Sequence, residues 1–73
     1  MNETQCRMAR AALRWSWDEL AAASGVNRMT VSRFEGGQKK ISDKSLDAMR
    51  AALEAAGVQF SRNGSLLVVA VPD

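Results

Sequence analysis

The side chains of this chain that could do chemistry do not assemble into an enzyme's site. Its 73 residues include no histidine and a single cysteine, Cys6. Nucleophilic catalysis needs a base beside the nucleophile, and neither Cys6 nor any serine has a candidate base. Nor does the sequence contain a glycine-rich phosphate loop or the clustered ligands of a zinc site. The sequence therefore predicts a protein that is not an enzyme and that binds neither a metal ion nor a cofactor.

Side chains that could contact the bases of a nucleic acid lie instead in one short segment, residues 28–33. The candidates are Arg28, Met29, Ser32 and Arg33. Each arginine could donate two hydrogen bonds to O6 and N7 of guanine, and Met29 could pack on a thymine methyl group. Ser32 could touch either a base or the DNA backbone. The alternative interpretation of the same residues is a solvated helix surface.

Positive charge is concentrated in the first half of the chain. Residues 1–40 contain seven Lys and Arg against four Asp and Glu, whereas residues 41–73 contain three against four. A basic half indicates a polyanionic partner. A solvated surface remains the alternative, because charge alone does not distinguish the two.

Four helices and a hairpin are expected to position these residues. Apolar residues recur at helical spacing in four segments, at residues 4–13, about 17–24, about 28–35 and about 43–56. The expected N-caps are Thr4, Ser16, Asn27 and Ser42. Ser16 and Glu19 fit a capping box, and Gly25 fits the left-handed residue that ends the second helix. We expect a mainly α fold, with four helices within residues 1–57.

The pattern changes to that of a β-hairpin after residue 57. Asn63-Gly64 is a favoured turn between strands expected at about 58–61 and 66–71. The second strand is apolar on both faces, and its residues are Leu66, Leu67, Val68, Val69, Ala70 and Val71. A lone hairpin cannot bury both faces. We therefore expect residues 58–73 to mediate dimerisation, the alternative being a hairpin packed only on its own domain.

The segment 17–35 has the outline of a helix-turn-helix, with two short helices around Gly25. The residues that carry a closer resemblance are Ala9-Arg10, Leu13, Trp15 to Ala21, Ser24 to Asn27 and Thr30 to Gly37. Together they resemble the XRE/Cro/C1 family of phage-repressor-like helix-turn-helix proteins over about residues 4–56. The resemblance implies binding of double-stranded DNA through a recognition helix at about 28–35.

The resemblance also implies roles for individual residues. Arg28, Met29 and Arg33 match base-contacting positions, and Arg10 and Glu35 match a structural ion pair. Asn27, Gln38 and Lys39 match positions that contact the DNA backbone. The full set of expected backbone contacts is Trp17, Asn27, Thr30, Gln38, Lys39 and Lys40. Trp17 departs from the family, in which glutamine at this position often contacts phosphate. Its indole could donate one N–H to a phosphate or simply pack.

These features favour a bacterial or phage transcriptional regulator, a repressor that binds an inverted-repeat operator as a homodimer. The alternative is an antitoxin-like or adaptor protein whose apolar tail binds a different protein. A cytoplasmic location is expected, since a single thiol is compatible with a reducing compartment. No membrane span is predicted, because the longest apolar run, 66–71, is far shorter than the roughly 20 residues that a span needs.

Overall fold

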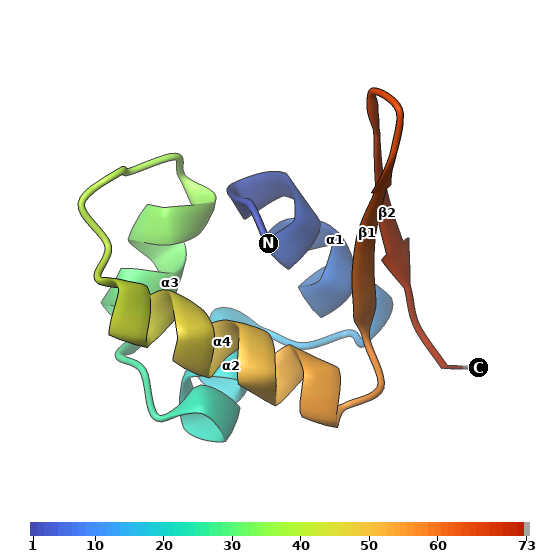
Figure 1. The fold of residues 1–73 in the computed structure, drawn as a ribbon. Helices are drawn as coiled ribbons and strands as arrows, with labels where there is room; N and C mark the ends of the chain where they lie inside the picture. Colours follow the sequence, from blue (N-terminus) through green and yellow to red (C-terminus); the bar gives the residue numbers. More distant parts are fainter. Residues whose placement is uncertain (73) are drawn as a thin grey trace.

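The computed structural model describes residues 1–72 as four helices followed by an antiparallel hairpin (Figure 1). The elements are α1 (Glu3–Ala12), α2 (Trp17–Ser24), α3 (Arg28–Glu35), α4 (Asp43–Ala55), β1 (Gln59–Asn63) and β2 (Leu66–Ala70). The hairpin stands along one side of the helical group, with its loop at the top of the view in Figure 1. The mainly α architecture with a C-terminal hairpin is therefore confirmed.

Side-chain caps set the starts of the helices. Ser16 Oγ accepts a hydrogen bond from the N–H of Glu19 at 3.1 Å, and the Glu19 carboxylate accepts one from the N–H of Ser16 at 3.0 Å, as the sequence predicted. Asn27 and Ser42 cap α3 and α4 as expected.

The N-cap of α1 is Asn2, and the prediction of Thr4 was wrong. Asn2 Oδ1 accepts from the N–H of Gln5 at 2.8 Å, and Gln5 Oε1 accepts from the N–H of Asn2 at 3.1 Å. This reciprocal pair satisfies two N–H groups at the helix start. A cap at Thr4 would place Arg7 at the third helical position. An arginine side chain has no acceptor there for the backbone N–H of the cap residue.

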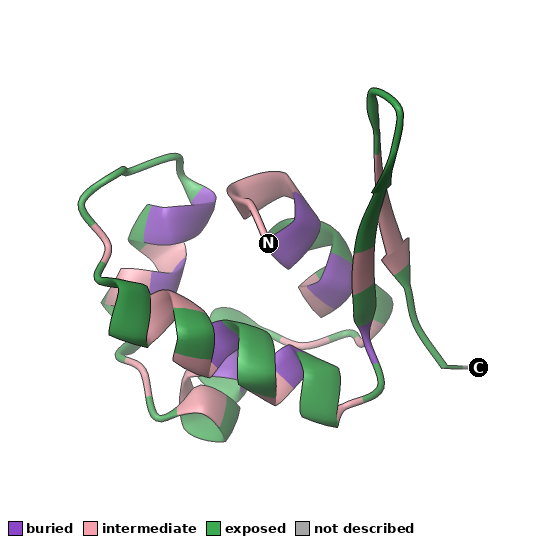
Figure 2. Cartoon of the chain, viewed as in Figure 1, coloured by how far each residue is buried: buried purple, intermediate pink, exposed green. Residues whose placement is uncertain are grey.

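The core lies between the four helices and the first residue of the hairpin segment. Its buried apolar residues are Cys6, Ala9, Leu20, Val31, Phe34, Met49, Leu53 and Val58. Figure 2 shows buried positions on the sides of the helices that face one another. Val31 and Phe34 come from α3, so one side of this helix is committed to the core and the other faces outward.

The hairpin register differs by one residue from the prediction. Asn63 pairs with Leu66, so the two-residue loop is Gly64-Ser65, and the expected turn at Asn63-Gly64 was wrong. In the observed register Phe60 lies opposite Val69, and both side chains pack against the core. A one-residue slip in either strand would turn one of these side chains to the outer face. Core packing therefore sets the register.

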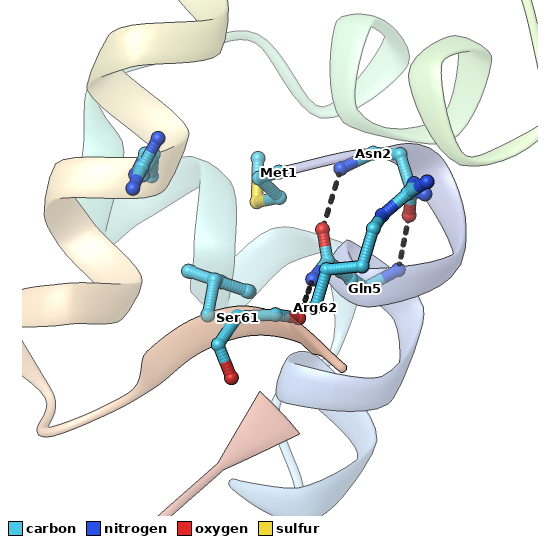
Figure 3. Close-up of a pocket in the computed structure, with 7 residues that line it drawn as sticks. Met1, Asn2, Gln5, Ser61 and Arg62 are labelled. Carbon is cyan, nitrogen blue, oxygen red and sulfur yellow. Dashed lines mark hydrogen bonds between the residues drawn. The ribbon is translucent and has the colours of Figure 1, made fainter. Parts of the chain in front are cut away.

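Gln5 bridges α1 and the hairpin. Its Nε2 donates to the carbonyl oxygens of Ser61 at 3.1 Å and Val68 at 3.4 Å, two residues that face each other across the hairpin. Its Oε1 simultaneously completes the cap of α1 with Asn2 (Figure 3). The bridge forms part of the wall of a pocket of about 370 Å³. One buried amide thus fixes the hairpin relative to the helices.

Gln5→Glu tests this bridge, because it keeps the capping acceptor and removes the donor. A carboxylate oxygen would then face two carbonyl oxygens. We expect the free energy of unfolding to fall by about 1–3 kcal/mol, measured by urea denaturation. Gln59→Glu makes the same chemical change at an exposed strand residue and is the matched control. Equal losses in the two variants would mean that the bridge adds nothing.

Candidate nucleic-acid interface

The turn between α2 and α3 fixes the angle at which α3 is presented. Gly25 ends α2 with φ of 74°, a left-handed conformation that glycine adopts without steric penalty. Ser24 Oγ donates to the carbonyl of Leu20 at 2.7 Å and accepts from the N–H of Val26 at 3.2 Å. These local bonds close the turn. Because Val31 and Phe34 are buried, the opposite side of α3 must face solvent.

The four predicted base-contacting residues all lie on this outward side of α3. Arg28, Met29 and Arg33 are exposed, whereas Ser32 is half-buried. Met29 has 58% of its surface exposed, so its side chain is open to contact with a partner. A recess of about 260 Å³ lies beside it, lined by Trp17, Asn27, Arg28, Met29 and Ser32. The structure thus brings all of the predicted base-contacting residues except Arg33 to one recess.

The predicted backbone-contacting residues other than Trp17 lie in two places. Gln38, Lys39 and Lys40 are exposed in the segment after α3. Asn27 and half-buried Thr30 lie at the turn, where they line a second recess of about 390 Å³. Asn27 Oδ1 accepts from the N–H of Met29 at 2.7 Å, which leaves its amide N–H groups as the donors that could reach a phosphate.

Lys44 is a cationic residue that the sequence analysis missed. It lies in the first turn of α4 and lines the same recess as Asn27 and Thr30. It was missed because it lies in the second half of the chain, where the net charge is not positive. The Ser42 cap was the available signal, because it places Lys44 at the start of a helix.

Trp17 uses its indole N–H inside the protein. The N–H donates to Glu35 Oε1 at 3.2 Å, so a phosphate hydrogen bond from this group, one of the two predicted alternatives, does not fit the structure. The ring also lies near two guanidinium groups, with the Arg10 and Arg28 Cζ atoms 6.0 Å and 5.6 Å from its centroid. Both distances are within cation–π range. Any contact of Trp17 with the DNA backbone would have to use the ring.

Arg10 and Glu35 form a two-point ion pair beneath the recognition helix. Arg10 Nε and Nη2 each donate to one oxygen of Glu35 at 2.8 Å, and Glu35 is only 4% exposed. Arg10 also donates through Nη1 to the carbonyl of Trp15 at 2.8 Å. Arg7 donates to the backbone carbonyl of Glu35. The C-terminal end of α3 is thereby fastened to α1 and α2.

The protonation states follow from this geometry. Burial raises the pKa of Glu35, but hydrogen bonds from Arg10 and Trp17 outweigh it, and the net pKa lies below the ordinary 4.5. The hydrogen bond to Glu35 raises the pKa of Arg10. Burial, together with the Glu35 charge, raises the pKa of Cys6 to about 12. Cys6 is therefore a protonated thiol whose Sγ donates to Glu35 at 3.6 Å, and it does not act as a nucleophile.

The sequence matches a known protein family, in agreement with this geometry. A family model described as Helix-turn-helix matches residues 7–57, which is more than half of the chain. The chain therefore belongs to the XRE/Cro/C1-type helix-turn-helix family, and it is a DNA-binding transcription regulator. No curated protein matches the sequence. Within residues 1–72, no helix is both long enough and apolar enough to cross a membrane.

Glu35→Ala is expected to lower the free energy of unfolding by about 3 kcal/mol at neutral pH, because it leaves the Arg10 guanidinium unpaired. Glu35→Gln tests the pH dependence. Since the folded-state pKa of Glu35 lies below 4.5, its carboxylate stabilises the fold above that pH, and this contribution is lost as the pH falls through the folded-state pKa. Wild type should therefore lose more unfolding free energy on acidification than Glu35→Gln does.

Urea titrations at a series of pH values measure both effects. Glu54→Gln is the control, because Glu54 forms only an exposed ion pair with Arg50 and its loss should cost little. Parallel pH curves for wild type and Glu35→Gln would contradict the assigned role of the carboxylate.

Proposed function

We propose that this protein binds an inverted-repeat operator as a homodimer and represses transcription there. The observation that carries the proposal is the outward side of α3, where two arginines and an exposed methionine lie on a helix fixed by a partly buried ion pair. A helix of eight residues reaches only a few base pairs. Useful specificity against a genome requires more, and two copies related by a two-fold axis supply it.

The contacts of each subunit divide into two kinds. Arg28 and Arg33 read guanine edges, Met29 packs on a thymine methyl group, and Ser32 contacts a base or the backbone. Phosphates are contacted by Asn27, Thr30, Gln38, Lys39, Lys40 and Lys44. These contacts set the register and most of the affinity, whereas the α3 side chains set the sequence preference. The proposed regulator has no enzymatic activity and acts in the cytoplasm, where bacterial and phage operators are found.

The free edge of β2 is the proposed dimer contact. A two-residue loop closes with a hydrogen-bonded pair, here Asn63 and Leu66, and hydrogen-bonded pairs alternate with non-bonded ones along an antiparallel hairpin. The backbone N–H and C=O groups of Leu67 and Val69 therefore point away from β1. Gln5 supports this assignment, because the Ser61 and Val68 carbonyls converge on its Nε2, as expected if both lie between the strands.

The outer face of β2 is also apolar. Leu66 is 63% exposed, Ala70 is exposed and Val68 is half-buried. An exposed edge of this composition promotes aggregation unless it is paired. Antiparallel pairing with the same strand of a second copy satisfies the edge and creates a four-stranded sheet, and a two-fold axis generates that arrangement. The proposed interface is Leu66, Leu67, Val68, Val69, Ala70 and Val71.

The chain thus has two parts in this proposal. Residues 1–57 bind DNA, and residues 58–73 join the subunits; the last of these, Asp73, lies outside the described residues. An antitoxin-like or adaptor role would use the same edge of β2 for a different protein. The oligomeric state of the purified protein distinguishes these two uses.

DNA binding is tested by titrations of duplexes selected from a random pool at several salt concentrations. Affinity should fall steeply with salt as counterions are released from the DNA. Arg33→Ala and Arg28→Ala should each lose about 1–3 kcal/mol of discrimination at one base pair. Lys39→Ala should weaken all sequences alike and reduce the salt slope by about one. An unchanged sequence motif in both arginine variants would refute the assignment of α3 as the reading element.

Dimerisation is tested by sedimentation of wild type and Val69→Pro. Proline removes the outward N–H of Val69 and should yield a monomer with weaker DNA binding. Val69→Ala is the matched control, because it loses the same core side chain and keeps the N–H, and it should remain dimeric. Val68→Pro is unsuitable, since the N–H of Val68 lies inside the hairpin. A monomeric wild type, or a dimeric Val69→Pro, would refute the β2 interface and leave the family assignment in place.

A further inference from the structure

We propose that Asp18 is a positioning residue that holds the Arg28 guanidinium for reading a guanine edge and so sharpens base specificity. The inference rests on the proposed DNA-binding role of α3. It assigns a function to an acidic residue that has no role in the core, since 74% of the Asp18 side chain is exposed.

Two contacts from α2 restrain the Arg28 side chain on α3. Asp18 Oδ1 lies 3.1 Å from Arg28 Nε, and the Arg28 guanidinium carbon lies 5.6 Å from the centroid of the Trp17 ring. Because Asp18 occupies the Nε side, the two terminal amino groups remain as the donors for guanine O6 and N7. The arginine is thus restrained at one end and open at the other.

The platform under Arg28 is itself fixed. The Trp17 N–H donates to Glu35 at 3.2 Å, and Glu35 is held by Arg10. The Trp17 contact of Arg28 is therefore tied to the Arg10–Glu35 ion pair, whereas Asp18 is an exposed side chain. Trp17, which lacks the phosphate hydrogen bond expected of this position, gains a different use as this platform.

The charge of Asp18 is otherwise unfavourable at this place. A carboxylate beside a recognition surface repels the phosphates that the neighbouring cations attract. Interaction with the N-terminus of α2 offers a purely structural reason for it, but Glu19 already places a carboxylate in the same turn as part of the capping box. Pairing with Arg28 gives a reason for this unfavourable charge. The carboxylate partly compensates the charge of Arg28, so Arg28 is less attracted to DNA phosphates, whatever the DNA sequence. Specificity gains what non-specific affinity loses.

The effect should be small but measurable. Exposed ion pairs contribute little, and an effect of this size changes a binding ratio about two- to fivefold. The base pair read by Arg28 is first located as the position at which Arg28→Ala loses the preference that wild type shows in selection from a random duplex pool. Wild type, Asp18→Asn, Arg28→Ala and the double variant are then titrated with the preferred duplex and with one altered only at that base pair.

Asp18→Asn should lower the ratio of the two affinities about two- to fivefold, chiefly by strengthening binding to the altered duplex. The Arg28→Ala background has no preference left at this base pair, so its ratio should stay near one with or without Asp18. The fall of the ratio in Asp18→Asn alone is the readout, since a merely structural role would weaken both duplexes alike. Asp47→Asn, the same charge change at an exposed position on α4, is the control and should leave the ratio unchanged.

An unchanged ratio in Asp18→Asn would overturn the inference and, with a lowered melting temperature, would assign Asp18 to the stability of α2. An Arg28→Ala variant that keeps the wild-type motif would overturn it as well. These results leave DNA binding intact. Failure of wild type to bind any duplex would refute the proposed function itself.

Discussion

A buried carboxylate at the end of the recognition helix holds the molecule together. Glu35 is 4% exposed and accepts hydrogen bonds from Arg10 and Cys6 on α1 and from Trp17 on α2. A charge in this environment is tolerated only while its partners remain in place. Any displacement of α3 would leave the charge partly unpaired, so three helices are restrained by one group. The two carboxylate oxygens and their four donors also define the orientation of α3. Apolar packing alone would define it less sharply.

This restraint matters because α3 is too short to be stable by itself. Isolated helices of eight residues are marginal in water, and tertiary contacts must supply the stability. Val31 and Phe34 anchor one side of α3 through burial, and Glu35 anchors its end through charge. Arg10 neutralises the Glu35 carboxylate, so the anchor adds little negative field near a surface that must attract phosphates. Stability and electrostatic attraction are thereby made compatible.

The sequence predicted those features whose causes lie within a few residues. The Ser16 capping box, the Gly25 turn and the inward side of α3 are of this kind. The Asn2 cap is an exception, because Asn2 and Gln5 have the local spacing of a capping box, which the prediction of Thr4 overlooked. The hairpin register, by contrast, depends on distant core packing. Only family resemblance indicated the Arg10–Glu35 pair, and nothing local indicated that the Trp17 N–H would join it, since this depends on how α2 meets α3.

The protonated thiol of Cys6 makes the junction of α1 and α3 observable. With a pKa of about 12, this buried sulfur is nearly inert to alkylating reagents and oxidants while the helices stay together. In an opened molecule it regains the ordinary acidity of a cysteine and reacts. The labelling rate of Cys6 in the native state therefore reports how often the contacts of Glu35 with α1 and α2 open. A slower rate with bound DNA would mean that operator binding also stabilises these contacts.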